Sequence, residues 1–304
     1  MAPQTHGAFA SLRFRKNRDR IVEAVLLAAG LVAVFTTVAI VVILVMESST
    51  FFAHVSLKEF LTDREWTPLF ADAHYGIMPL VAGTVTVTGV ALLVAIPFGT
   101  LIAIYLSEFA PHRLRETVKP ALELLGAVPT VVYGYFALLM VTPLLRKVYP
   151  DLPGFNMLSA GLVIGLMIIP YVASVSEDAM RAVPRYMREG SYAMGATRLQ
   201  TALRVVVPGA LSGLAAAYIL GISRAVGETM VVAIAAGMQP NLTFNPTEPA
   251  ATITAYIVQV SLGDLPHGSI GYQSIFAAGL VLMLMTLVFN VVGFFLTRRF
   301  REAY

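Results

Sequence analysis

Long stretches without a charged side chain constrain this sequence more than any other feature. Five segments of 22 or more residues contain no Asp, Glu, Lys or Arg: 24–46, 73–107, 124–145, 152–176 and 265–297. A sixth stretch, 205–247, is interrupted only by Arg224 and Glu228. Because about 20 apolar residues cross a bilayer as a helix, the sequence predicts an all-α polytopic membrane protein. Its six transmembrane helices are expected near 21–46, 78–107, 120–145, 157–178, 208–238 and 271–297.

The composition excludes most other classes of protein. Apolar residues make up 57% of the 304 residues and charged residues 13%, with a mean hydropathy of +0.76. A soluble domain carries about 25% charged residues, so this chain has too few charges to cover a soluble surface. A cytosolic enzyme, a disordered protein and a nucleic-acid binder are therefore excluded, despite the net charge of +3. Cysteine is absent, which excludes disulfides and cysteine metal sites.

The distribution of Lys and Arg predicts the orientation. Sixteen of the 21 fall before residue 21, in the loops 113–119 and 181–204, or after residue 297, and only four lie in the alternate loops. The positive-inside rule places both termini in the cytoplasm, with the spans in the cytoplasmic (inner) membrane of a bacterium. The expected organisation is a cytoplasmic tail (1–20), a first transmembrane helix (21–46), a periplasmic loop (47–76), a transmembrane core (77–297) and a cytoplasmic tail (298–304). The outer loops are either docking surfaces for an external partner or plain connectors.

Arg224 and Glu228 are the ionisable residues inside a predicted span. Each costs roughly 3 kcal/mol at the bilayer centre even on a lenient scale, and their i, i+4 spacing places them on one helix face. They are either an ion pair that only fixes helix packing, or an Arg that faces an anion pathway and is held by its Glu. A guanidinium suits a tetrahedral oxyanion because it donates two parallel hydrogen bonds. Ser223, Thr229 and Thr84 are candidate hydroxyl ligands, although such residues more often bond their own helix or a neighbouring one.

No motif in the sequence predicts ATP binding or catalysis. None of the four Lys residues is followed by Ser or Thr, as a P-loop requires. The five His residues fall in tails, loops or span edges, without metal-ligand spacing. We therefore expect neither an enzyme nor a cofactor in this chain, and ATP-driven work would need a separate ATPase.

The basic segment 179–207 carries a recognisable motif, and Pro184 is expected to open a helix there, at about 184–200. Glu189-Gly190-Ser191 is followed after three residues by Gly195 and after nine more by Val205-Val206-Val207-Pro208. This resembles the pattern Glu-Ala-Ala, three residues, Gly, nine residues, Ile-x-Leu-Pro of the permease subunits of binding-protein-dependent ABC importers. The departures from the pattern are small or aliphatic. The resemblance implies a type I importer permease fold and a cytoplasmic coupling helix that binds a groove of the ATPase. It implies the coupling residues Arg188, Glu189, Gly190, Ser191, Gly195 and Ala196.

Further segments resemble the phosphate-specific members of that family. Residues 223–230 (SRAVGETM) are similar to the Arg-Ala-x-Gly-Glu-Thr stretch of both phosphate permease subunits, whose Arg and Glu are implicated in transport. Residues 66–68 (WTP), 75–79 (YGIMP) and 123–134 (ELLGAVPTVVYG) are similar to the PstC-type subunit. The resemblance covers roughly residues 20–297. It implies that Arg224 and Glu228 act on phosphate, and Tyr133 joins the candidate pathway residues.

The resemblance also implies partners. They are a homologous sister permease (PstA-type), an ATPase dimer (PstB-type) that binds ATP and Mg²⁺, and a periplasmic or lipid-anchored phosphate-binding protein (PstS-type). Membrane lipids surround the assembly, and no nucleic acid is expected as a partner. Three alternatives stay open. The substrate could be another oxyanion, sulfate or molybdate, since residue types do not separate tetrahedral anions. The chain could be a secondary anion carrier or channel that works alone, or a membrane scaffold that senses phosphate.

Overall fold

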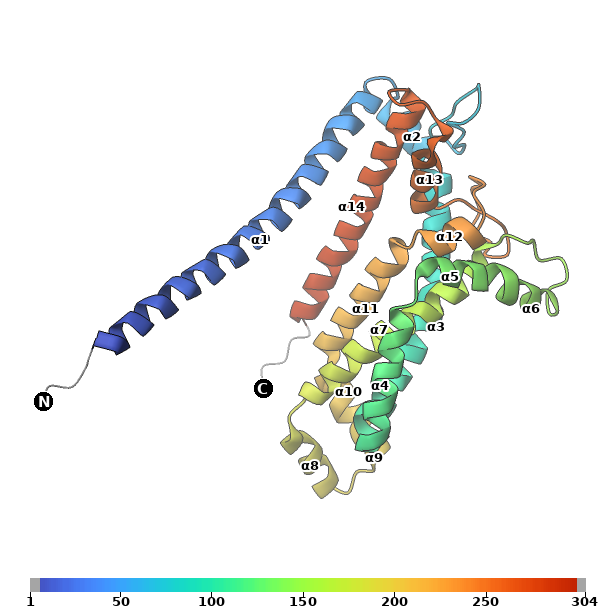
Figure 1. Cartoon of the computed structure of the whole chain (residues 1–304). Coiled ribbons are helices and arrows are strands. Elements are labelled where there is room, and N and C mark those ends of the chain that lie inside the picture. The colour runs from blue at the N-terminus through green and yellow to red at the C-terminus, as the bar shows by residue number, and fades with distance from the viewer. Residues whose placement is uncertain (1–5, 300–304) are drawn as a thin grey trace, which may run out of the picture.

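The computed structural model describes residues 6–299 and is helical along almost all of that range (Figure 1). The predicted tails 1–20 and 298–304 lie partly outside the described residues. The helices are α1 (His6–Phe52), α2 (Leu57–Thr62), α3 (Met78–Ile104), α4 (His112–Gly126), α5 (Thr130–Phe136), α6 (Thr142–Arg146), α7 (Met157–Ala182), α8 (Arg185–Ala193), α9 (Arg198–Thr201), α10 (Val207–Gly209), α11 (Leu211–Val226), α12 (Met230–Ala235), α13 (Ile253–Gln259) and α14 (Ile270–Arg299). Short π-helical turns occur at Tyr105–Phe109 (η1), Ala137–Val141 (η2), Ala202–Val206 (η3) and Val260–Asp264 (η4). The all-α prediction is confirmed.

Within residues 6–299, four helices are long and apolar enough to cross a membrane: most of α1, α3 with η1, α7 and α14. Two further spans are bent pairs, in which α4 meets α5–α6 at 86° and α9–α10 meets α11 at 73°. Counting each bent pair as one span gives the six predicted crossings. The prediction of a continuous helix over 120–145 is wrong, because α4 ends at Gly126 and Pro129 adopts an extended conformation (φ −56°, ψ 133°). The predicted helix 208–238 is also wrong, because α11 ends at Val226 and α12 starts at Met230.

Helix α7 lies at the centre of the transmembrane core. It buries Met157, Ile164 and Ile168 in an apolar cluster shared with α3, α11 and α12. A Cβ on Gly165 would lie 2.8 Å from the carbonyl oxygen of Ala91, so the glycine lets the backbones of α7 and α3 approach closely. The core is therefore packed around α7, which contacts both bent spans.

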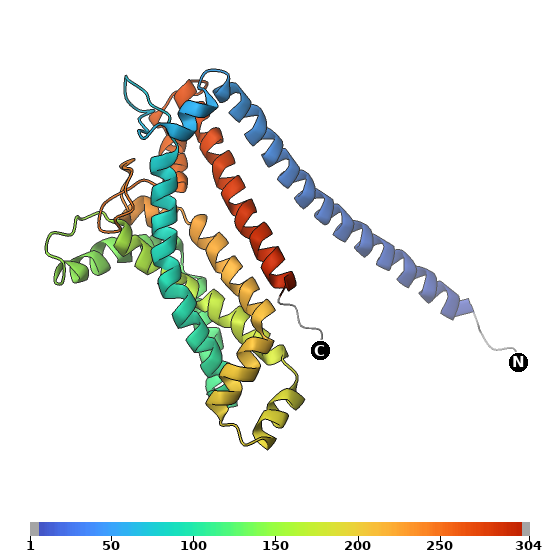
Figure 2. The same ribbon diagram turned by 180° about the vertical axis from the view of Figure 1, so that it is seen from behind.

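Helix α1 diverges from the other helices in both views (Figures 1 and 2). No part of its most apolar window is buried, and side chains such as Leu26 and Phe35 are 68% and 74% exposed. Only the end near Phe51 reaches a core, which it shares with α2, α13 and α14. Most of α1 is therefore an apolar surface that this chain alone does not cover.

The loop between α1 and α3 is ordered by aromatic packing. Trp66 is 1% exposed and contacts the ring of Tyr256 edge-on, with centroids 5.0 Å apart. Trp66 also pairs with Tyr75 in an isolated β-bridge, and His74 Nδ1 lies 2.9 Å from Asp63 Oδ2. This loop therefore forms a folded cap on the N-terminal end of α3 and on α13.

Candidate functional site

The chain leaves the helical conformation between Arg224 and Glu228. Helix α11 ends at Val226, and Gly227–Thr229 lead into α12, which starts at Met230. The expectation that an i, i+4 spacing puts both side chains on one helix face is therefore wrong. No ion pair joins Arg224 to Glu228 in the described part of the chain. The two residues have separate surroundings.

Glu228 caps the following helix. Its side chain is buried, and Oε1 accepts hydrogen bonds from the backbone N–H groups of Met230 (3.1 Å) and Val231 (3.2 Å) at the start of α12. The Glu228 carbonyl accepts a hydrogen bond of 2.7 Å from the hydroxyl of Thr254 on α13. A carboxylate at a helix N-terminus satisfies N–H groups that have no partner within the helix. Glu228 therefore fixes the bend after α11.

Arg224 carries a charge that no carboxylate of the described residues balances. Its guanidinium carbon lies 4.0 Å from the centroid of the Tyr171 ring, a cation–π contact. Its Nε is buried and has no hydrogen-bond partner among the described residues. The side chain is half-buried. Since an Arg offers five N–H donors in a planar fork, Arg224 retains the capacity to bind an oxyanion.

Two tyrosine hydroxyls bond the end of α4 at the bend between α4 and α5, and one of them, on Tyr171, also connects this bend to Arg224. The Tyr171 hydroxyl donates to the Gly126 carbonyl (2.9 Å), and the Tyr133 hydroxyl donates to the Leu125 carbonyl (2.8 Å). These are among the last carbonyls of α4, which have no partner within the helix. Helix α5 also packs against α12, since a Cβ on Gly134 would lie 2.9 Å from the side chain of Ile234. The two chain breaks therefore meet around Arg224.

Tyr171 has no place among the residues singled out from the sequence. It follows Pro170 in the middle of an apolar run. A polar aromatic residue inside a predicted span is the feature of the sequence that could have identified it. Its contact with Arg224 joins residues 53 positions apart in sequence. A local spacing of residues cannot predict a contact over that distance. The site is built by packing of α7 against α11.

The hydroxyl candidates have other partners. The Ser223 hydroxyl lies 3.5 Å from Asn290 Oδ1 on α14. Thr229 donates to the carbonyl of Gly227 (3.1 Å). Thr84 donates to the Leu80 carbonyl and accepts from the Ile253 N–H (3.1 Å). The structure thus brings Arg224, Glu228, Thr229 and Tyr133 to the two breaks, whereas Thr84 and Ser223 bond neighbouring segments.

The predicted coupling segment 184–200 comprises α8, opened by Pro184, and the short α9. Gly195 adopts φ +82° directly after α8, a conformation that only glycine takes without strain. The Ser191 hydroxyl lies 2.9 Å from the Thr201 hydroxyl, which ties α8 to α9. Glu189, Gly190 and Gly195 are exposed, and Ala196 is half-buried. With Tyr186 64% and Met194 88% exposed, the segment presents an uncovered surface.

Arg188 differs from the other coupling residues because it faces the core. Its Nε and Nη2 donate to the Glu108 carboxylate on η1, at 3.2 and 2.9 Å. Nη1 donates to the Val183 carbonyl and Nη2 to the Met180 carbonyl, at 2.6 and 2.8 Å. Arg188 therefore fastens α8 to the C-terminal ends of α3 and α7.

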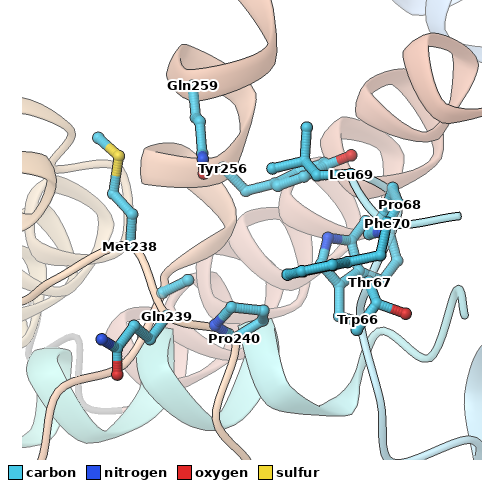
Figure 3. Close-up of a pocket in the computed structure, with 11 residues that line it drawn as sticks. Trp66, Thr67, Pro68, Leu69, Phe70, Met238, Gln239, Pro240, Tyr256 and Gln259 are labelled. Atoms are coloured by element: carbon cyan, nitrogen blue, oxygen red, sulfur yellow. The ribbon is translucent and has the colours of Figure 1, made fainter. Parts of the chain in front are cut away.

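A cavity of about 220 Å³ opens at the other end of the molecule (Figure 3). Trp66, Pro68 and Phe70 of the aromatic loop form one wall, and Met238–Pro240 form the opposite wall. Gln259 of α13 closes one end. The lining is mainly apolar, and in the described residues no group of three or more His, Cys, Asp or Glu side chains could hold a metal ion.

A helical fold with up to six spans, an Arg within a span that has no ion pair among the described residues, and an exposed segment after α7 are typical of a polytopic transport protein. Residues 95–302 match the family model "Binding-protein-dependent transport system inner membrane component". The chain belongs to this family and is a multi-pass inner-membrane permease subunit of a transporter.

Individual relatives extend over most of the chain. A probable ABC transporter permease protein, YqgH of Bacillus subtilis, is 35% identical over 90% of this chain and 88% of its own length. The phosphate transport system permease protein PstC of Mesorhizobium japonicum is 30% identical over 79% of this chain and 78% of its own.

The fold is shared with a solved importer structure. A bacterial alginate ABC transporter, in complex with an alginate pentasaccharide-bound periplasmic protein, has a chain that aligns with a TM-score of 0.65 at 19% identity. The alignment covers 93% of this chain and 96% of that one. At this identity the likeness supports the fold alone.

Proposed function

We propose that this chain is the permease subunit through which an ATP-driven importer moves inorganic phosphate across the bacterial cytoplasmic membrane. The observation that carries the proposal is Arg224, a half-buried guanidinium beside two chain breaks, stacked on Tyr171 and paired with no described carboxylate. Planar N–H groups donate to two oxygens of a tetrahedral anion at once. The name of the relative from Mesorhizobium japonicum supports phosphate as that anion.

A single guanidinium suits transport because a site must release what it binds. Several unpaired cations would hold phosphate too tightly, and an ion-paired Arg would have to exchange its carboxylate for the substrate. Arg224 avoids both conditions, because Tyr171 supports its charge from one side and leaves its donors available. Glu228 acts through the backbone, by holding the bend that sets the depth of Arg224.

The proposed partners correspond to three uncovered surfaces. A phosphate-loaded binding protein docks at the outer cavity between Trp66 and Pro240. A sister permease covers the exposed face of α1. An ATPase dimer, which binds ATP and Mg²⁺, receives α8 and its exposed Tyr186 and Met194. This arrangement places both termini and α8 in the cytoplasm, in agreement with the excess of Lys and Arg on that side.

The test is uptake of radiolabelled phosphate by cells that carry Arg224→Gln. We expect uptake to fall by at least about tenfold, because the variant loses charge-assisted hydrogen bonds to the anion. Arg224→Lys, which keeps the charge but loses the planar fork, should retain part of the activity. Arg204→Gln, an exposed change on η3, is the matched control.

The amount of each variant in the membrane and its co-purification with an ATPase are measured in parallel. Normal uptake by an assembled Arg224→Gln variant would contradict the proposal. Sulfate and molybdate uptake measured in the same cells identifies a different oxyanion as the substrate. A scaffold or sensor would keep phosphate signalling intact in this variant.

A further inference from the structure

An arginine-rich cavity lies at the opposite end of the helices from the outer cavity. It is a cavity of about 340 Å³ between η1, α4, the end of α7 and α8. The lining consists of Leu106, Ser107, Ala110, His112, Arg115, Arg181, Arg185 and Arg188. Four guanidinium groups from three helices thus face one space, and no carboxylate is among the lining residues.

The four arginines differ in how many of their N–H donors already form hydrogen bonds within the chain. Arg188 is committed to Glu108 and to two carbonyls. Arg115 uses its Nε in a 2.7 Å hydrogen bond to Glu177, which leaves its Nη groups available. Arg181 lies 3.7 Å from Glu177, beyond hydrogen-bond distance, and Arg185 has no ion-pair partner in the part of the chain that the structure describes.

Glu177 makes this arrangement rigid. Its side chain is fully buried, and besides Arg115 it accepts a hydrogen bond of 2.9 Å from Lys119. Lys119 also binds Asp178. These contacts join α4 to α7 and hold Arg115 against the cavity wall. An anion entering the cavity would therefore meet donors that are already placed, which lowers the entropy cost of binding.

We propose that this cavity binds a phosphate group, held by Arg115, Arg181 and Arg185. Guanidinium groups recognise phosphate through paired charge-assisted hydrogen bonds, and basic pockets at the ends of membrane helices accept anionic lipid headgroups. The group belongs either to an anionic phospholipid or to free inorganic phosphate. The two sources share the chemistry of the phosphate oxygens.

The position of the site gives the bound group a structural consequence. Arg185 lies on α8, Arg115 on α4 and Arg181 on α7, so a single phosphate group would bridge all three helices. Arg188 already joins α8 to η1 through Glu108. Occupancy of the cavity would add a second connection between the coupling segment and the transmembrane core, and would favour the position of α8 seen here.

Binding to the purified full chain, with the subunits that co-purify, tests this proposal. Every protein in the test carries Arg224→Gln, so that the proposed transport site does not contribute to binding. In the lipid arm, native mass spectrometry measures phosphatidylglycerol retained after detergent exchange. In the free-phosphate arm, equilibrium dialysis measures radiolabelled inorganic phosphate bound in phosphatidylcholine nanodiscs. Arg181→Gln/Arg185→Gln is compared with Arg198→Gln/Arg204→Gln, which removes two cytoplasmic-side arginines outside the cavity.

We expect the cavity variant to bind one of the two ligands about tenfold more weakly, because charge-assisted hydrogen bonds are lost. The control variant should keep its binding, and Arg181→Lys/Arg185→Lys, which keeps the charges but loses the planar forks, should keep part of it. A loss confined to phosphatidylglycerol identifies a lipid site, and a loss confined to inorganic phosphate identifies a site for the free anion. Equal binding by the cavity variant and the control, in both arms, would overturn the proposal. Because both replaced side chains are exposed, the variant should fold, and its elution in size-exclusion chromatography verifies this.

Discussion

Two arginines in this molecule have opposite surroundings. Arg188 donates to one carboxylate and two carbonyls, whereas Arg224 stacks on a tyrosine and meets no carboxylate among the described residues. Arg188 is 16% exposed and its partner Glu108 4%. A residue that transmits force between helices benefits from permanent contacts, and a residue that binds a passing anion needs available donors. The two environments therefore indicate two roles for the same side chain.

Arg188→Ala should have the largest effect on stability. It would leave Glu108 buried without its counter-charge, and breaking a buried ion pair costs about 3 kcal/mol. Thermal unfolding of the purified chain and hydrogen exchange of α8 measure the loss. Arg198→Ala, an exposed change on α9 at a residue without an ion-pair partner among the described residues, is the control and should change stability by no more than about 0.5 kcal/mol. Equal stability of the two variants would show that the Arg188 contacts do not hold α8.

Glu228 tests whether Arg224 is independent of a nearby carboxylate. Glu228→Gln keeps an oxygen that accepts from the Met230 and Val231 N–H groups, so the bend and the assembly should persist. Glu228→Ala loses this cap and should cost about 1 kcal/mol of stability. Thermal unfolding of both variants, with Thr229→Ala as a neighbouring control, provides the measurement. A Gln variant as unstable as the Ala variant would show that the bend depends on the charge of Glu228 and not only on its acceptor oxygen.

The fold was largely predictable because apolar length and charge position are local properties of the chain. Six crossings follow from the uncharged stretches, and the motif around Glu189 and Gly195 identifies the segment after α7. The positions of the bends were harder to predict from the sequence. Pro129 disfavours a continuing helix, but the 86° bend is held by Tyr171, which bonds Gly126 from 45 residues away. A linear pattern does not contain such a contact.

The candidate site was predictable only in part, for the same reason. Arg224 is identified by the cost of an intramembrane charge, which requires no knowledge of its neighbours. Its partner was assigned by helical spacing to Glu228, although the helix ends at Val226 between them. The contacts of Arg188 with Glu108 span 80 residues. The sequence thus identifies the charged residues, whereas tertiary packing determines which of them form pairs.

A third charged contact, between Asp63 and His74 in the loop between α1 and α3, depends on pH. The hydrogen bond to Asp63 raises the pKa of His74 above its ordinary 6.5, and burial opposes this shift. For Asp63, burial acts to raise the pKa, but the hydrogen bonds from His74 and from the Glu65 N–H outweigh it, so the pKa falls below the ordinary 3.8. The His74 contribution to stability is complete below pH 6.5 and is lost as pH rises through the raised native pKa. The Asp63 contribution is complete above pH 3.8 and is lost as pH falls through the lowered native pKa.

The outer loop should therefore be most protected from hydrogen exchange between pH 3.8 and 6.5, after correction for the intrinsic exchange rate. The effect is the smallest of the three, because His74 is 40% exposed and solvent screens the pair. His74→Gln should remove the loss of protection above pH 6.5, and Asp63→Asn should flatten the profile on both sides. His54→Gln, which changes a histidine whose ring bonds only the Thr50 carbonyl among the described residues, should leave the profile unchanged. A pH-independent loop in the unmodified chain would mean that aromatic packing around Trp66 alone holds this region, and that the ion pair, unlike the one at Arg188, contributes nothing to it.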